Sequence, residues 1–290
     1  MRLSLLILAP VLAGCAERAK PKPRPPITVF AAASLARPLK VLADSFHART
    51  GGLARVELGG SLDQARKITE LGRVPDVLML IDEDVTAALL PTHLDWYVRF
   101  ATNRLVVAYT PRSKHADSIT ADNWWKILGR RDVTVGRADP DVAPAGRQAL
   151  SLIRRAESYY KQRGLADRVM ERASLKYVRP NATELAALLE TGEVDYIVDY
   201  ESVARQYGFQ FVALPEDLSI AVLYTVSVPR DAPQFQGGVD FVAFVLSDDG
   251  KRMLRDAQLN VLSLPVAVGS GVPLEISEIV RTVSAAAFTN

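Results

Sequence analysis

The sequence predicts an α/β protein of two lobes, with mostly parallel sheets flanked by helices and two strands that cross between the lobes. From Ile27 onward, short β-like runs alternate with amphipathic helical stretches, a pattern typical of parallel sheets covered by helices. The runs DVLMLI (76–81) and RLVVAY (104–109) are almost continuously apolar, as expected of strands buried on both faces. The segment LDWYVRFATNRLVVAYTP reads as two β runs joined at 101–104, which is the pattern of a chain crossing between lobes.

The order of elements follows from the same alternation of strand and helix patterns. We expect strands at 27–31, 53–58 (LARVEL), 76–81, 105–110, 133–136 (VTVG), 174–178, 195–199 (DYIVD), 209–212 and 221–228 (AVLYTVSV). We expect helices near 35–49, 62–71, 83–90, 120–128, 145–163, 182–191, 201–206 and 234–256. A return crossing at LPEDLSIAVLYTVSVP places residues 27–100 and 225–290 in lobe I and residues 104–222 in lobe II. Sites in such architectures lie in the cleft, beyond the carboxyl ends of the strands.

The first 14 residues have the pattern of a signal peptide. MRLSLLILAPVLAGC carries Arg2 before an apolar stretch that is too short for the roughly 20 residues of a membrane span. Its LAGC ending resembles the bacterial lipobox, which implies that Cys15 is the lipidated first residue of the mature protein. The alternatives are a plain signal peptide and a buried cysteine.

Residues 15–26 then form a linker rich in proline and basic residues. Such a chain is extended at about 3.1 Å per residue, so it can hold a domain about 30 Å from a membrane or touch anionic headgroups. A merely solvated linker is the alternative. We therefore expect an extracytoplasmic protein, in the periplasm or at the cell surface, held to a membrane by the lipid on Cys15.

Composition excludes several classes of function. The formal net charge of +2 gives no reason to expect a nucleic-acid partner. Cys15 is the single cysteine, so no internal disulfide can form. The histidines His47, His93 and His115 are scattered, without the spacing of a zinc site or a Cys/His catalytic pair.

Four strand-to-helix junctions carry small or hydroxyl residues where a helix is expected to begin. Ser34 follows AAA, and Ser61 follows Gly59 and Gly60. Two further junctions, DPDVAPAGRQAL and VRPNATELAALLE, place Ala145–Gly146 and Asn181–Ala182 at helix starts.

The first turn of a helix offers unpaired N–H groups and the positive end of the helix dipole. Small residues let an anion approach those amides, and a serine hydroxyl adds a donor. Taken singly, each of these residues also fits an ordinary helix cap. Several such ends facing one cleft would bind a small oxyanion without lysine or arginine.

The motifs TVFAAASL, GGSLDQARKI, PDVLMLID, DPDVAPAGRQAL and LLETGEVDYIVDYESVA together resemble the molybdate/tungstate-binding proteins of ABC importers, over the chain from Ile27 to about Pro265. The resemblance implies the two-lobed fold of type II periplasmic-binding proteins. It also implies that the oxyanion is contacted through hydroxyls, backbone amides and a phenol at Ser34, Ser61, Ala145, Ala182 and Tyr200.

Three segments are similar to the tungstate-selective, archaeal-type branch of that family: YVRFATNRLVVAY, DNWWKIL and YESVARQYGF. Members of this branch add two carboxylates that approach the metal and make it six-coordinate. Here the matching positions hold small residues, near Ala143 and at Ala182, and the side chains of Glu184 and Asp141 are expected to point elsewhere. The hypothesis is a four-coordinate oxyanion, with molybdenum or tungsten held through its oxo ligands and no direct protein–metal bond.

The function implied is a monomeric receptor that captures molybdate or tungstate and delivers it to the permease and ATPase of an ABC importer, without a cofactor and without catalysis. A receptor for sulfate or another tetrahedral oxyanion is an alternative on the same fold. An extracytoplasmic enzyme or sensor is an alternative of a different class. It would need a general base or nucleophile in the cleft, for which Asp199 beside Tyr200 is the candidate.

Overall fold

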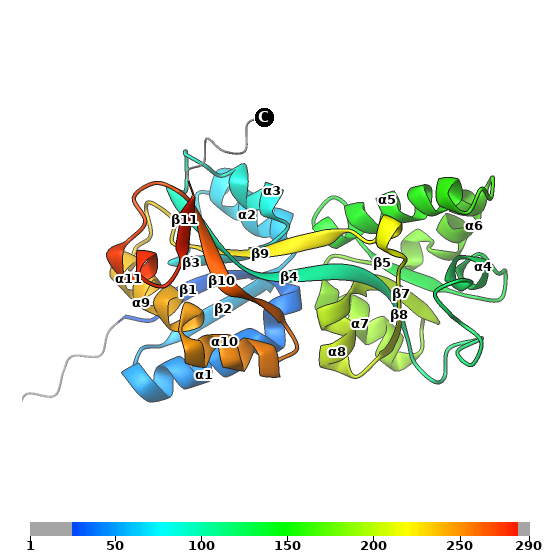
Figure 1. The fold of residues 1–290 in the computed structure, drawn as a ribbon, viewed down its shortest axis with the longest axis horizontal. Coiled ribbons are helices and arrows are strands. Elements are labelled where there is room, and N and C mark those ends of the chain that lie inside the picture. Colours follow the sequence, from blue (N-terminus) through cyan, green and yellow to red (C-terminus); the bar gives the residue numbers. More distant parts are fainter. Residues whose placement is uncertain (1–24, 284–290) are drawn as a thin grey trace, which may run out of the picture.

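The computed structural model describes residues 25–283 as two α/β lobes connected by long strands (Figure 1). The strands of these residues form one open, continuous hydrogen-bonded network, because β4 (Trp96–Tyr109) pairs with partners in both lobes. The two-lobed α/β architecture predicted from the sequence is thereby confirmed. The residue limits predicted for each lobe stay a prediction.

Three parallel strands begin the first lobe. β1 (Ile27–Ala32) lies between β2 (Ala54–Gly59) and β3 (Val77–Ile81). Every residue of β3 is buried, in agreement with its unbroken apolar run. The helices of this lobe are α1 (Ala36–Thr50), α2 (Ser61–Thr69), α3 (Glu83–Ala87), α9 (Phe235–Leu246), α10 (Asp248–Asp256) and α11 (Leu274–Ser277). Phe46 on α1 meets Phe241 on α9 edge-to-face with ring centroids 5.1 Å apart, which packs the two ends of the described chain together.

The two crossing strands, β4 and β9 (Ala221–Ser227), run side by side between the lobes (Figure 1). The two β runs expected on either side of 101–104 form one strand of 14 residues. Pairing with β9 is irregular between Arg99 and Ala101 and continues through Arg104, so the crossing segment keeps its hydrogen-bonded partner. On its other edge β4 pairs with β10 (Asn260–Gly269), which in turn pairs with β11 (Arg281–Val283).

In the second lobe, β7 (Tyr196–Tyr200) lies between β4 and β5 (Val135–Ala138). β6 (Val178–Arg179) and β8 (Gln210–Ala213) complete its sheet. The helices are α4 (Trp124–Leu128), α5 (Pro144–Tyr159), α6 (Leu165–Arg172), α7 (Ala182–Thr191) and α8 (Glu201–Tyr207). Within the described chain the sheets are mixed: every antiparallel pair includes β4 or β9, and the other pairs are parallel.

Some elements differ from the sequence prediction. The strand expected at 174–178 is wrong, because Leu175–Tyr177 forms a short 3-10 turn and only Val178–Arg179 pairs with β5. The single helix expected at 234–256 divides at Ser247, whose hydroxyl accepts a hydrogen bond from the amide of Gly250 at 3.2 Å and so caps α10. Helix α6 and strand β10 were not predicted.

Candidate functional site

One small cavity between the lobes brings together the five residues that the sequence analysis singled out. The centre of a water molecule can move through about 20 Å³ of this cavity, which is a little more than one water molecule needs. The residues that line it are Ala32, Ala33, Ser34, Gly59, Gly60, Ser61, Ile81, Ala138, Ala143, Pro144, Ala145, Asn181, Ala182 and Tyr200. Among these lining residues, none has a charged side chain.

Each of the five predicted residues lies where a helix begins. Ser34 is in the 3-10 turn that leads into α1, and Ser61 is the first residue of α2. Ala145 and Ala182 lie in the first turns of α5 and α7, and Tyr200 immediately precedes α8. First-turn amides have no acceptor within their own helix and lie at the positive end of its dipole. The cavity wall therefore combines hydrogen-bond donors with a favourable potential for an anion.

The hydroxyl of Ser61 is buried and has one partner within the described structure. Its Oγ lies 3.1 Å from the backbone nitrogen of Ile81, which donates to it. The hydroxyl hydrogen is therefore left to donate into the cavity. Ser34 has a different partner, the hydroxyl of Tyr224, at 3.0 Å from its Oγ.

The phenol of Tyr200, which lines the cavity, already has a hydrogen-bond partner behind the wall. Its hydroxyl donates to Oε1 of Gln148 at 3.2 Å, and Nε2 of Gln148 donates to Oδ2 of Asp82 at 3.2 Å. Burial raises the pKa of Tyr200 well above its ordinary value, so the phenol stays protonated and remains a donor. An anion in the cavity would therefore compete with Gln148 for the hydrogen of Tyr200.

The lobes are in contact around the cavity, so the structure is a closed form. Nε2 of Gln206 donates to the carbonyl oxygen of Ser34 at 3.1 Å, and the guanidinium of Arg37 donates to the carbonyl of Gln206. On another side, Nη1 of Arg66 donates to the carbonyl of Asp141 at 2.9 Å. These bonds join the first lobe to the second.

The nearby carboxylates are turned away from the cavity. Glu184 accepts from Nδ2 of Asn181 at 2.8 Å, and its own amide donates back to Oδ1 of Asn181 at 3.0 Å, in a helix cap near the surface. Asp141 is exposed. Ala143 and Ala182 line the cavity in their place. Among the residues that the structure describes, no carboxylate lines this cavity.

A family model for bacterial extracellular solute-binding proteins matches residues 27–257. The chain belongs to this family. A solute-binding protein of Petrotoga mobilis, described as uncharacterized, is 32% identical over 88% of this chain and 90% of its own length. The molybdate/tungstate-binding protein WtpA of Pyrococcus abyssi is 29% identical over 88% of this chain and 90% of its own length.

Structural comparison agrees with this assignment to the solute-binding proteins. The periplasmic molybdate-binding protein of Azotobacter vinelandii superposes with a TM-score of 0.67. The match covers 82% of this chain and all of that protein, at 16% sequence identity. At that identity, the similarity establishes the fold of this solute-binding protein.

Asp199 precedes Tyr200 in this solute-binding protein, and it is buried without lining the small cavity. Its side chain is 1% exposed, and Oδ1 accepts from the amide of Tyr200 at 2.8 Å. Oδ2 has no hydrogen-bond partner among the described residues, and burial raises the pKa of the carboxyl to about 7. Asp199 lines neither the small cavity nor the larger hollow described next, so its position does not suit a general base that acts in the cleft.

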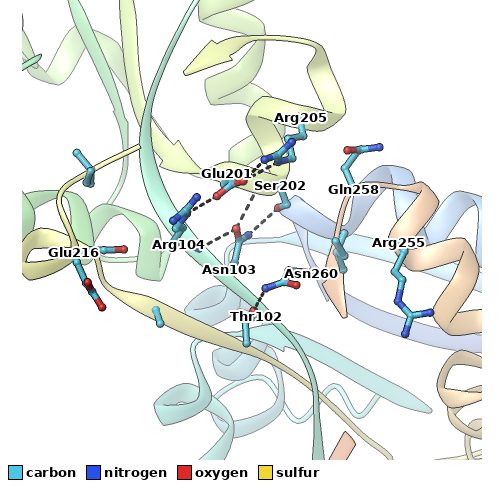
Figure 2. A pocket seen from close by; sticks show the side chains of 14 residues that line it. Thr102, Asn103, Arg104, Glu201, Ser202, Arg205, Glu216, Arg255, Gln258 and Asn260 are labelled. Carbon is cyan, nitrogen blue, oxygen red and sulfur yellow. Dashed lines mark hydrogen bonds and ion pairs between the residues drawn. The ribbon is translucent and has the colours of Figure 1, made fainter. Parts of the chain in front are cut away.

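A second, larger hollow of about 920 Å³ lies beside the crossing strands (Figure 2). Its walls come from β4, α8, the segment between β8 and β9, the start of β9, and the chain from the end of α10 to the start of β10. Two of its cations share one carboxylate, because Arg104 and Arg205 both form ion pairs with Glu201. Asn103 and Ser202 lie on its wall and are hydrogen-bonded to each other (Figure 2). The sequence analysis did not predict this hollow, although it placed a crossing at 101–104.

The structure bears on metal ligands and membrane-spanning helices only within the residues that it describes. Within residues 25–283, no group of three or more His, Cys, Asp or Glu side chains is arranged to hold a metal ion. No helix in the same range is long and apolar enough to span a membrane. Cys15, the predicted lipidation site, lies outside the described residues.

Proposed function

We propose that this solute-binding protein captures molybdate or tungstate between its lobes and delivers the ion to the permease and ATPase of an ABC importer. One observation carries the proposal: the five helix-start residues Ser34, Ser61, Ala145, Ala182 and Tyr200 line one small cavity with no charged lining residue. The name of the Pyrococcus abyssi relative, a molybdate/tungstate-binding protein, supports the same class of ligand.

The donors suit a tetrahedral dianion. Ser34 and Ser61 each offer a hydroxyl and a first-turn amide, and Ala145 and Ala182 offer first-turn amides. Tyr200 adds its phenol once it leaves Gln148. The negative charge would be balanced by hydrogen bonds and by the positive ends of α2, α5 and α7, without a lysine or an arginine.

The metal would keep four oxygen ligands. Small side chains stand at Ala143 and Ala182, and Glu184 is held in the cap of α7. The protein would therefore bind the oxo groups of molybdate or tungstate and form no direct bond to the metal.

A cavity lined by hydrogen-bond donors also favours oxyanions that carry no proton over those that carry one. Molybdate, tungstate and sulfate are fully deprotonated near neutral pH, whereas monohydrogen phosphate carries a proton that needs an acceptor. An unpaired buried polar group costs roughly 1–3 kcal/mol, so phosphate would be disfavoured.

The setting of the protein forms part of the same proposal. A lipid on Cys15 would hold a monomer on the outer face of a membrane through the linker of residues 15–26. Binding and release require no cofactor and no catalytic step.

Titration calorimetry of the full chain with molybdate, tungstate, sulfate and phosphate tests the function. We expect submicromolar binding of molybdate or tungstate and much weaker binding of phosphate. Micromolar or weaker binding of all four ions would contradict the proposal. Binding of sulfate at least as tight as that of molybdate would favour the sulfate receptor.

A matched pair of serine variants locates the site. Ser34→Ala should weaken binding by roughly 1–2 kcal/mol, the value of a donated hydrogen bond. Ser219→Ala removes a hydroxyl from the larger hollow and should leave the affinity unchanged. Equal effects of the two changes would argue against the small cavity.

A further inference from the structure

We propose that Asn103 and Tyr224, which do not line the cavity, determine which oxyanions it accepts by fixing the direction of the hydrogen bond at Ser34. The inference rests on the proposed oxyanion function and adds a specificity-determining relay behind the binding wall. This relay consists of three hydrogen-bonded side chains: Asn103 on the crossing strand β4, Tyr224 on β9, and Ser34 in the 3-10 turn that leads into α1.

The relay begins at Asn103, whose orientation is fixed by the backbone. Its Oδ1 accepts from the amide of Arg104 at 3.0 Å and from the amide of Ser202 at 3.3 Å. The amide nitrogen must therefore occupy the other position, where it donates to Oγ of Ser202 at 2.8 Å and to the hydroxyl oxygen of Tyr224 at 3.0 Å. Figure 2 shows Asn103 directed toward Ser202 at the wall of the larger hollow. Because Nδ2 can only donate, Asn103 sets a direction for the bonds that follow.

Tyr224 passes that direction on. It is fully buried, and burial raises the pKa of its phenol, so the group is neutral and has one hydrogen to donate. Its oxygen already accepts from Asn103. The hydrogen is then directed to Oγ of Ser34 at 3.0 Å, while the hydroxyl of Ser202, 3.2 Å away, can donate to Tyr224.

Ser34 is the end of the relay. Because its oxygen accepts from Tyr224, its own hydrogen is left for the cavity. Ser61 reaches the same state by a shorter route, since the amide of Ile81 occupies its oxygen. Both serines therefore have a hydrogen to present to an ion and one acceptor position already occupied, so each oxygen keeps only a single lone pair for the proton of a hydrogen oxyanion.

The test compares two oxyanions of equal charge and similar size. Near pH 8.5, selenate and monohydrogen arsenate both carry two negative charges, and the arsenate carries a proton. Their affinities for the full chain are measured by competition against molybdate. Wild-type protein should prefer selenate by at least tenfold.

Two variants change the relay in different ways. Tyr224→Phe removes the donor to Ser34, so the serine oxygen regains a lone pair for the arsenate proton. Asn103→Asp keeps the side-chain shape but places an acceptor before Tyr224, which reverses the relay and draws the hydrogen of Ser34 away from the cavity. Each change should reduce the selenate preference by about tenfold. The added charge of Asn103→Asp acts on both dianions alike and cancels in the ratio.

Thr225→Val is the matched control. Thr225 is a buried neighbour of Tyr224 on β9, and its hydroxyl is hydrogen-bonded to Thr86 at 2.6 Å, outside the relay. The control should keep the wild-type preference. Thermal melting shows which variants fold. If Asn103→Asp does not fold, Tyr224→Phe alone decides the question.

The outcomes separate the relay from the function. Absence of any oxyanion binding by the wild type would overturn the proposed function. Tight molybdate binding would uphold the function, and the relay would then be overturned by any of three results. In the first, the wild type does not prefer selenate. In the second, the relay variants fold and keep the wild-type preference for selenate. In the third, the Thr225→Val control loses that preference as much as the relay variants do.

Discussion

Gly60 of the first lobe lies directly against Val142 of the second, and a Cβ built on Gly60 would be 2.1 Å from the carbonyl oxygen of Val142. No real Cβ atom tolerates such a contact with backbone. The φ of −67° and ψ of 142° at Gly60 suit any L-residue. The glycine is therefore required by the approach of the two lobes and not by its own backbone conformation.

Replacing Gly60 with alanine should prevent full closure. We expect Gly60→Ala to weaken molybdate binding by at least tenfold while leaving the thermal stability of the ligand-free protein close to wild type, since open lobes avoid the contact. Calorimetry and thermal melting measure the two effects. Gly129→Ala is the control, because its new Cβ would come no closer than 3.4 Å to a neighbour. Undiminished affinity in Gly60→Ala would show that binding does not need this contact.

The two serines of the cavity should differ in their effects on stability. In the wild-type protein the amide of Ile81 donates to the hydroxyl of Ser61. Ser61→Ala removes this acceptor and leaves the buried amide without it, at a cost of about 1–3 kcal/mol. Ser34→Ala removes the acceptor of Tyr224, which still has Oγ of Ser202 within 3.2 Å. Urea denaturation should therefore show a larger loss of unfolding free energy for Ser61→Ala. The reverse order would contradict these hydrogen-bond assignments.

The metal of a bound ion should be four-coordinate. X-ray absorption at the molybdenum or tungsten edge of the loaded protein should show four short metal–oxygen distances and no further oxygen ligand. Glu184→Gln should change neither the spectrum nor the affinity, since Glu184 serves the cap of α7. Additional oxygen ligands that disappear in this variant would assign a carboxylate to the metal.

The buried carboxyl of Asp199 should make stability depend on pH. Its pKa is raised from 3.8 to about 7 in the folded protein, so between about pH 4 and pH 7 the folded state binds more protons than the unfolded state. Stability contributed by this group is present at low pH and is lost as pH rises through 7. The unfolding free energy of wild type relative to Asp199→Asn should fall with a slope of up to about 1.4 kcal/mol per pH unit in that window. Parallel pH profiles in denaturant titrations would refute the assignment.

Local sequence signals predicted the helix starts of the cavity well. Ser34, Ser61 and Ala182 stand beside strands and small residues, so nearby residues suffice to place them at helix starts. Ser247 shows the opposite case: its role as a cap divides one amphipathic pattern into two helices, which hydrophobic periodicity alone does not reveal. β10 was missed because its burial does not alternate regularly.

Partners distant in the chain could not be predicted. Tyr224 reaches Ser34 across 190 positions of sequence, and Gln148 reaches Tyr200 across 52. These contacts depend on how helices pack against the sheets and on which face of each strand is turned inward. A single sequence supplies no signal for either, so the donors of the wall were predictable and the groups behind them were not.

The enclosure of the small cavity has a kinetic consequence. With about 20 Å³ of space and Ser34, Ser61 and Tyr200 each no more than 4% exposed, an ion held by these groups would be largely covered while the lobes touch. Its dissociation would then depend on how fast the lobes separate. A membrane partner that pulls the lobes apart would therefore accelerate release without competing for the ion, and residence time would be set by the hinge.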